Sequence, residues 1–139
     1  MPIEKFTHHH AEMAQIANTI LDLASAGSLS EIALLQSKRI ELSKLVADHC
    51  ALEGAHLQKH QAQSNHPQKA ALLRKFHGDL LAWRGALMEC NANWPAKSIV
   101  QNPAGFRAVF GKLIKQLNDR IQWEEREFYP AIFGTPTPR

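Results

Sequence analysis

The chain has 139 residues, 45% of them hydrophobic, which is enough for one domain with a buried core. Its 16 basic and 13 acidic residues are scattered, and no apolar run approaches the roughly 20 residues of a membrane span, so we expect neither a nucleic-acid-binding surface nor a membrane protein. The first ten residues lack a signal peptide's apolar core and the two cysteines, Cys50 and Cys90, set no disulfide framework, so we expect a cytoplasmic protein with free thiols.

Apolar residues recur with a period close to 3.6 over most of the chain, which predicts an all-α protein. A first helix is expected from about Phe6 to Ala26, with Gly27 as its C-cap. A second and longer helix is expected from Ser28 to about Gln63, because Ser28 and Glu31 have the spacing of a capping box.

The second half of the chain predicts two more helices. The third is expected from Pro67 to about Cys90 and is followed by a loop over "NANWPAKSIVQNP". The fourth begins with Asn102 as N-cap and continues past Phe128. Four amphipathic helices with three connections predict an up-down-up-down four-helix bundle over residues 1–134, with residues 135–139 as a flexible tail.

Four polar residues follow one stripe of the second helix. His49, Glu53, His56 and His60 are spaced by four, three and four residues, so they lie within a sector of roughly 60°. Apolar neighbours bracket His49, so His49 and Glu53 are expected to point inward, at least in part. The alternative is a surface pair or a buried pair whose hydrogen bonds are satisfied within the protein.

Histidines also fall on the expected inner faces of two other helices. His77 lies four residues after Leu73 and three before Leu80. His9 and His10 are four and three residues before Met13, so either can face the bundle axis. In an antiparallel bundle these histidines and the far end of the second helix lie at the same end. Imidazoles and carboxylates that converge from several helices are the way in which di-iron and di-manganese sites are built.

With these features the chain resembles the hemerythrin-like, or HHE cation-binding, proteins. The residues that carry the resemblance are the His9/His10 region, the His49 to Glu53 motif in "DHCALEG", His77, and the paired acids, aromatic residue and proline of "WEEREFYPAI". The resemblance implies a four-helix bundle that holds a non-haem di-iron centre, and for this chain, with its departures described below, we expect one or two iron ions. It also implies the ligands: His9 or His10, His49 and His77 as imidazoles, Glu53 as one bridging carboxylate, and Glu125 or Glu124 as the other.

Two positions depart from the family pattern. Arg120 stands where the fourth helix should carry a histidine, and a guanidinium has no lone pair for a metal. The second histidine expected near His77 is also absent. One hypothesis is that Arg120 serves as the cation that a metal would have been and pairs with Glu53 or Glu125 inside the bundle. The other is that Arg120 reaches solvent and pairs with Glu124, four residues on.

Three functions remain open after these departures. The first is a cation-binding protein that holds iron and through it binds a small diatomic ligand, dioxygen or nitric oxide, for sensing, storage or iron handling. The second is a metal-free bundle that acts as a protein-interaction or regulatory module. The third, an iron-dependent enzyme of peroxide or nitric oxide chemistry, needs the open coordination positions that a depleted ligand set would provide, and it has the least support. The sequence carries no nucleophile elbow and no phosphate-binding loop, so nothing in it argues for a hydrolase or a transferase.

Overall fold

The computed structural model describes residues 2–26, 28–62 and 67–134. Its helices are α1 (Pro2–Ala26), α2 (Leu29–Ala62), α3 (Pro67–Asn93), the short α4 (Ala96–Gln101), α5 (Pro103–Trp123), the π-helical turn η1 (Glu124–Phe128) and α6 (Tyr129–Phe133). The prediction of an all-α fold is confirmed. The expected cap Gly27, the expected end of the second helix at Gln63 and the expected tail at 135–139 lie outside the described residues.

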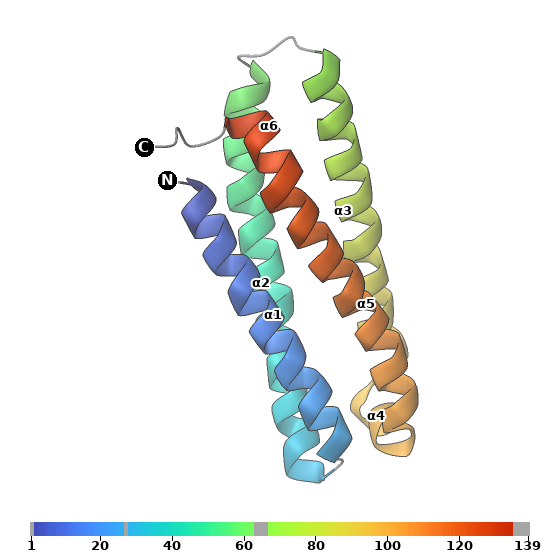
Figure 1. The fold of residues 1–139 in the computed structure, drawn as a ribbon. Helices are drawn as coiled ribbons and strands as arrows, with labels where there is room; N and C mark the ends of the chain where they lie inside the picture. The colour runs from blue at the N-terminus through green and yellow to red at the C-terminus, as the bar shows by residue number, and fades with distance from the viewer. Residues whose placement is uncertain (1, 27, 63–66, 135–139) are drawn as a thin grey trace.

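The long helices run alternately up and down (Figure 1). α1 packs along α2 and against α5, and α3 packs against α5. The start of α1, the second half of α2 and the segment from η1 to α6 therefore lie at the same end of the bundle. None of the helices in the described ranges is long and apolar enough to cross a membrane, and Cys50 and Cys90 are free thiols, as predicted.

Two predicted helix starts are confirmed by their capping bonds. The backbone N–H of Glu31 donates to Ser28 Oγ at 3.3 Å, and that of Gly105 donates to Asn102 Oδ1 at 3.0 Å. Gly105 is required at this second cap, because a Cβ there would lie 2.3 Å from Asn102 Nδ2 and 2.8 Å from the Trp94 ring.

The expectation of a loop over "NANWPAKSIVQNP" is wrong in part. α3 continues to Asn93, and residues 96–101 form α4, which begins after Pro95. The reason is a tertiary contact, since Ile99 of α4 is completely buried in the core. Burial of one apolar side chain stabilises a short helix that local propensity alone would leave marginal.

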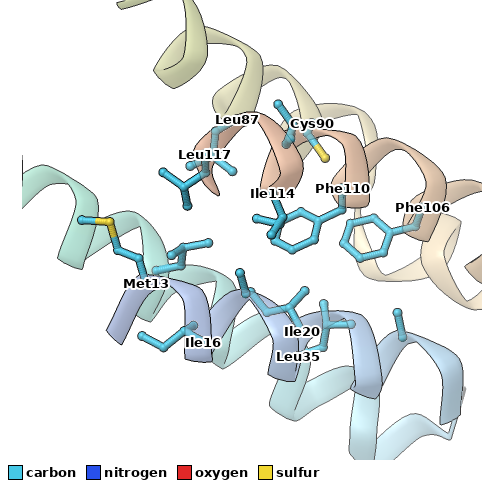
Figure 2. Close-up of a cluster of buried hydrophobic side chains, with 14 of the residues drawn as sticks. Met13, Ile16, Ile20, Leu35, Leu87, Cys90, Phe106, Phe110, Ile114 and Leu117 are labelled. Carbon is cyan, nitrogen blue, oxygen red and sulfur yellow. The ribbon is translucent and has the colours of Figure 1, made fainter. Parts of the chain in front are cut away.

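The core consists of two apolar clusters stacked along the bundle axis. Figure 2 shows the larger cluster, in which α1, α2, α3 and α5 contribute side chains that include Met13, Ile16, Ile20, Leu35, Leu87, Phe106, Phe110, Ile114 and Leu117. The smaller cluster contains Phe6, Leu57, Leu73, Phe76, Phe128, Tyr129 and Ile132. On α1, on α2 and on the helix that ends in α6, the residues between the two clusters are polar.

Candidate metal centre

Four polar residues are buried between the two apolar clusters. His10 comes from α1, His49 and Glu53 from α2, and Glu124 from η1, and each is at most 4% exposed. One imidazole nitrogen or carboxylate oxygen of each lies within 4.8 Å of those of the others. The prediction that His49 and Glu53 point inward is therefore confirmed, and their reading as a surface pair is wrong.

Both imidazole rings of the cluster are held from their outer side. His10 Nδ1 lies 2.7 Å from Glu125 Oε2, and His49 Nδ1 lies 3.0 Å from His9 Nδ1. When Nδ1–H of each ring donates in these bonds, the lone pair of each ring is left on Nε2, which faces the cluster. Metal-binding histidines in proteins are oriented by this kind of outer hydrogen bond.

The inner nitrogen of His49 has no hydrogen-bond partner, although it is buried. The nearest carboxylate oxygen, Glu53 Oε2, is 3.4 Å away from His49 Nε2. A buried polar atom without a partner is costly in free energy and uncommon in folded proteins. The alternative of a buried pair with satisfied hydrogen bonds therefore does not describe His49, whose lone pair is left for a ligand.

Tyr129 closes the cluster from α6. Its hydroxyl donates to Glu53 Oε2 in a short hydrogen bond and also contacts Glu124 Oε1 at 3.0 Å and His10 Nε2 at 3.4 Å. Burial and the two nearby carboxylates raise the pKa of Tyr129 far above its usual range, so the hydroxyl keeps its proton. The sequence signal for Tyr129 was its place in "WEEREFYPAI", but spacing alone did not identify it as part of the site.

Arg120 pairs with Glu124 inside the protein. Arg120 Nε lies 2.7 Å from Glu124 Oε2, and the two side chains are 9% and 4% exposed. The Nε–H does not point along this contact, so it is an ion pair without an aligned hydrogen bond. Arg120 also donates from Nη2 to the Phe76 carbonyl at 3.1 Å, with the guanidinium 4.6 Å from the centre of the Phe76 ring.

The two hypotheses for Arg120 are thus each correct in one respect. Its acidic partner is Glu124, as the surface hypothesis expected, but the pair is buried, as the internal hypothesis expected. Neither Glu53 nor Glu125 is its partner among the ion pairs of the described residues.

Charges and hydrogen bonds set the protonation of Glu124 and His10. Burial raises the pKa of Glu124, but hydrogen bonding to His10 and the Arg120 charge outweigh it and hold this pKa below its ordinary value. Burial lowers the pKa of His10, but the hydrogen bonds to Glu124 and Glu125 outweigh it and raise this pKa above 6.5.

A small cavity adjoins the cluster. It measures about 20 Å³, and besides the four cluster residues its lining includes Arg120, Cys50, Trp83 and Leu117. A cavity of this volume is about large enough to hold one water molecule. Arg120 and Trp83 also line an open groove between α3 and α5, so these two side chains separate the cavity from that groove.

The expectation that His77 points into the bundle is wrong. His77 is exposed on α3, and its ring lies nearly perpendicular to the Phe76 ring at a centroid distance of 5.3 Å. The buried stripe of α3 runs through Leu73, Phe76, Trp83, Leu87 and Cys90. Phe76 therefore occupies the inward position, and His77 is rotated by about 100° from it.

The arrangement suits a first-row transition metal. Two neutral imidazole nitrogens and two carboxylate oxygens are ligands that iron, manganese and zinc accept. Ligands about 2.0–2.2 Å from one ion are about 3–4.4 Å apart, so the atoms of this cluster that are farthest apart, at up to 4.8 Å, would move closer together around a bound ion. The residues of this chain therefore fit a bound metal ion.

A family model described as "Hemerythrin HHE cation binding domain" matches residues 1–132, which is nearly the whole chain. No curated protein matches the chain. No solved structure matches it either.

Proposed function

The chain belongs to the hemerythrin HHE cation-binding family, and from this premise we propose that it binds non-haem iron at His10, His49, Glu53 and Glu124. We further propose that the iron serves to bind a small diatomic ligand for sensing, storage or iron handling. The observation that carries the proposal is the unpartnered Nε2 of His49, which is buried among carboxylates.

The surrounding residues have supporting roles in this proposal. His9 and Glu125 hold the two rings so that Nε2 faces the cluster. Tyr129 donates to Glu53 and keeps an oxygen of that carboxylate in place. When bound, iron would supply an open coordination position for dioxygen or nitric oxide, and a small cavity adjoins the cluster.

One observation favours the second candidate function, a metal-free module that binds another protein. Arg120 gives Glu124 a cation inside the protein, so this carboxylate is stabilised without a metal. His49 Nε2 has no such partner, and for this reason we place the cation-binding function first.

The test is a metal analysis of matched variants. The protein is purified without a histidine tag and without chelators, loaded with ferrous iron under anaerobic conditions, and analysed for bound metals and by visible spectroscopy. We expect iron in the wild-type protein, loss of at least about tenfold in affinity in His49→Ala, and no loss in His77→Ala. His77→Ala is the matched control, because His77 is a histidine of the same bundle that the structure places on the surface.

Two results would contradict the proposal. The first is a wild-type protein that holds no iron after anaerobic loading, which would leave the metal-free module. The second is equal iron binding in the wild-type protein and His49→Ala, which would mean that the metal binds elsewhere.

A further inference from the structure

We infer that the centre holds one metal ion per chain and that Arg120 provides the second positive charge beside it. This inference rests on the proposed function, because it specifies how many ions that site takes. It departs from the two-ion centre that the resemblance implies.

The available ligands support one ion. In the described ranges, a single group of three or more histidine, cysteine, aspartate or glutamate ligand atoms comes together, and it has four members. His9 and Glu125 contact the outer Nδ1 atoms of the two rings, on the side away from Nε2. His77 is exposed and His9 bonds to the outer Nδ1 of His49, so neither of these two histidines adds an imidazole to the cluster.

The position of Arg120 limits Glu124 to one metal. One oxygen of Glu124, Oε2, is 2.7 Å from Arg120 Nε, and the other, Oε1, faces His10 Nε2 at 3.1 Å and the Tyr129 hydroxyl. A carboxylate that bridges two ions needs both oxygens for them. In this chain a guanidinium stands where the second ion would approach Oε2.

Space and charge agree with this assignment. The cavity beside the cluster measures about 20 Å³, which is about the space of one water-sized occupant. Glu53 and Glu124 are the two fully buried carboxylates, and Arg120 already offsets one of their charges. One divalent ion more than neutralises the rest, and a second would be a buried charge without a partner.

The first measurement is stoichiometry. The untagged protein is titrated anaerobically with ferrous iron, and in parallel with Mn²⁺, and bound metal is counted after gel filtration. We expect one ion per chain at saturation. Two ions per chain would overturn this inference and leave the proposed function intact, whereas no bound ion would overturn both.

The second measurement tests the charge of Arg120. Arg120→Gln removes the cation beside the cluster, so we expect Mn²⁺ to bind at least about tenfold more tightly, since a unit charge a few ångströms away opposes a divalent ion by several kcal/mol at an effective dielectric constant of about 20. Unchanged or weaker binding would contradict the role of Arg120 as a built-in cation.

Two further variants separate charge from packing. Lys115→Gln is the matched control, because Lys115 lies on the same helix and also pairs with the acid four residues on, Asp119, but is exposed. We expect no change in Mn²⁺ affinity there. Arg120→Lys keeps the charge and should bind Mn²⁺ within about threefold of the wild-type protein; tightening like that of Arg120→Gln would show that lost packing and not lost charge is responsible, and would contradict the inference.

Discussion

His10 is a single residue on which protonation and metal binding compete. Its Nε2 faces Glu124 and its Nδ1 bonds to Glu125. Although burial lowers its pKa, these two carboxylates raise it above 6.5, so His10 carries a proton in a larger fraction of molecules than an exposed histidine at neutral pH. A metal needs the Nε2 lone pair, so the proton must leave when a metal binds.

The sign of the pH dependence follows from this raised pKa. In the metal-free protein, the contribution of His10 to folding is fully present below its unfolded pKa of about 6.5 and is lost as the pH rises through the raised, folded value. Metal affinity has the opposite trend. We expect Mn²⁺ to bind more tightly at about pH 8 than at about pH 6, with release of a proton at the lower pH.

Calorimetric titration in two buffers of different ionisation enthalpy measures both the affinity and the proton count. An affinity that does not change over this range would contradict the assignment of His10 as a ligand.

At the scale of elements, Arg39 holds the corner where α3 meets α4. Arg39 is buried on α2, and its guanidinium donates to Asn91 Oδ1 at 3.1 Å, to the Trp94 carbonyl at 2.6 Å and to the Cys90 carbonyl at 3.4 Å. The Cys90 carbonyl lies in the last turn of α3 and also accepts from the Trp94 backbone N–H at 3.0 Å, and Trp94 itself lies just beyond the end of this helix. Arg39 thus ties the end of α3 to α2.

We predict that Arg39→Met lowers the free energy of unfolding by about 2–4 kcal/mol, because it removes the hydrogen bonds of a buried guanidinium to Asn91, Trp94 and Cys90. Urea unfolding followed by circular dichroism measures the change. Arg107→Met is the matched control, since Arg107 is exposed and makes one bond, from Nε to the Leu21 carbonyl at 3.3 Å. We expect that variant to lose less than about 1 kcal/mol; equal losses in the two variants would contradict the role of Arg39.

The sequence predicted the long helices and most of the cluster because both depend on a 3.6-residue period. His49, Glu53, His10 and Glu124 were all among the candidates, and all are buried. His77 was misplaced because Phe76 and His77 both fit a stripe that contains Leu73 and Leu80, and only packing decides between adjacent positions.

Two elements could not be predicted from the 3.6-residue period of apolar residues. α4 depends on the burial of Ile99 in a core formed by other helices. η1 breaks the period itself, because the backbone N–H of Tyr129 bonds to the carbonyl of Glu124, five residues before it. The place of Tyr129 in the site follows from that bond and could not be read from α-helical spacing.

At the scale of the whole molecule, the candidate metal ligands are distributed unevenly among the helices. The four cluster residues come from α1, α2 and η1, and none comes from α3 among the described residues. A metal ion would therefore tie three segments together at one end of the bundle, whereas α3 is held there by contacts of Phe76, whose ring stacks on Phe128 at 4.4 Å and whose carbonyl accepts from Arg120.

We predict that Mn²⁺ raises the melting temperature and slows amide hydrogen exchange unevenly. The first three turns of α1 and the segment around Glu53 should gain protection, because binding stabilises the folded state at those residues. Residues 96–101, at the opposite end of the bundle (Figure 1), should gain less. Hydrogen exchange with mass spectrometry, with and without Mn²⁺, measures the pattern. Equal protection throughout would contradict a site at that end.

The π-helical turn η1 adds one residue to the helix that runs from α5 to α6. A turn that spans five residues holds one residue more than a turn of α-helix, so η1 is equivalent to a one-residue insertion absorbed within a helix. The extra length is accommodated where Arg126 and Glu127 are exposed. The adjacent acids Glu124 and Glu125, which begin this turn, reach the two nitrogens of one ring, His10. A chain shortened by one residue at position 126 or 127 would regain a regular helix, and Tyr129 would be rotated by about 100° relative to Glu124, away from the cluster that it now closes.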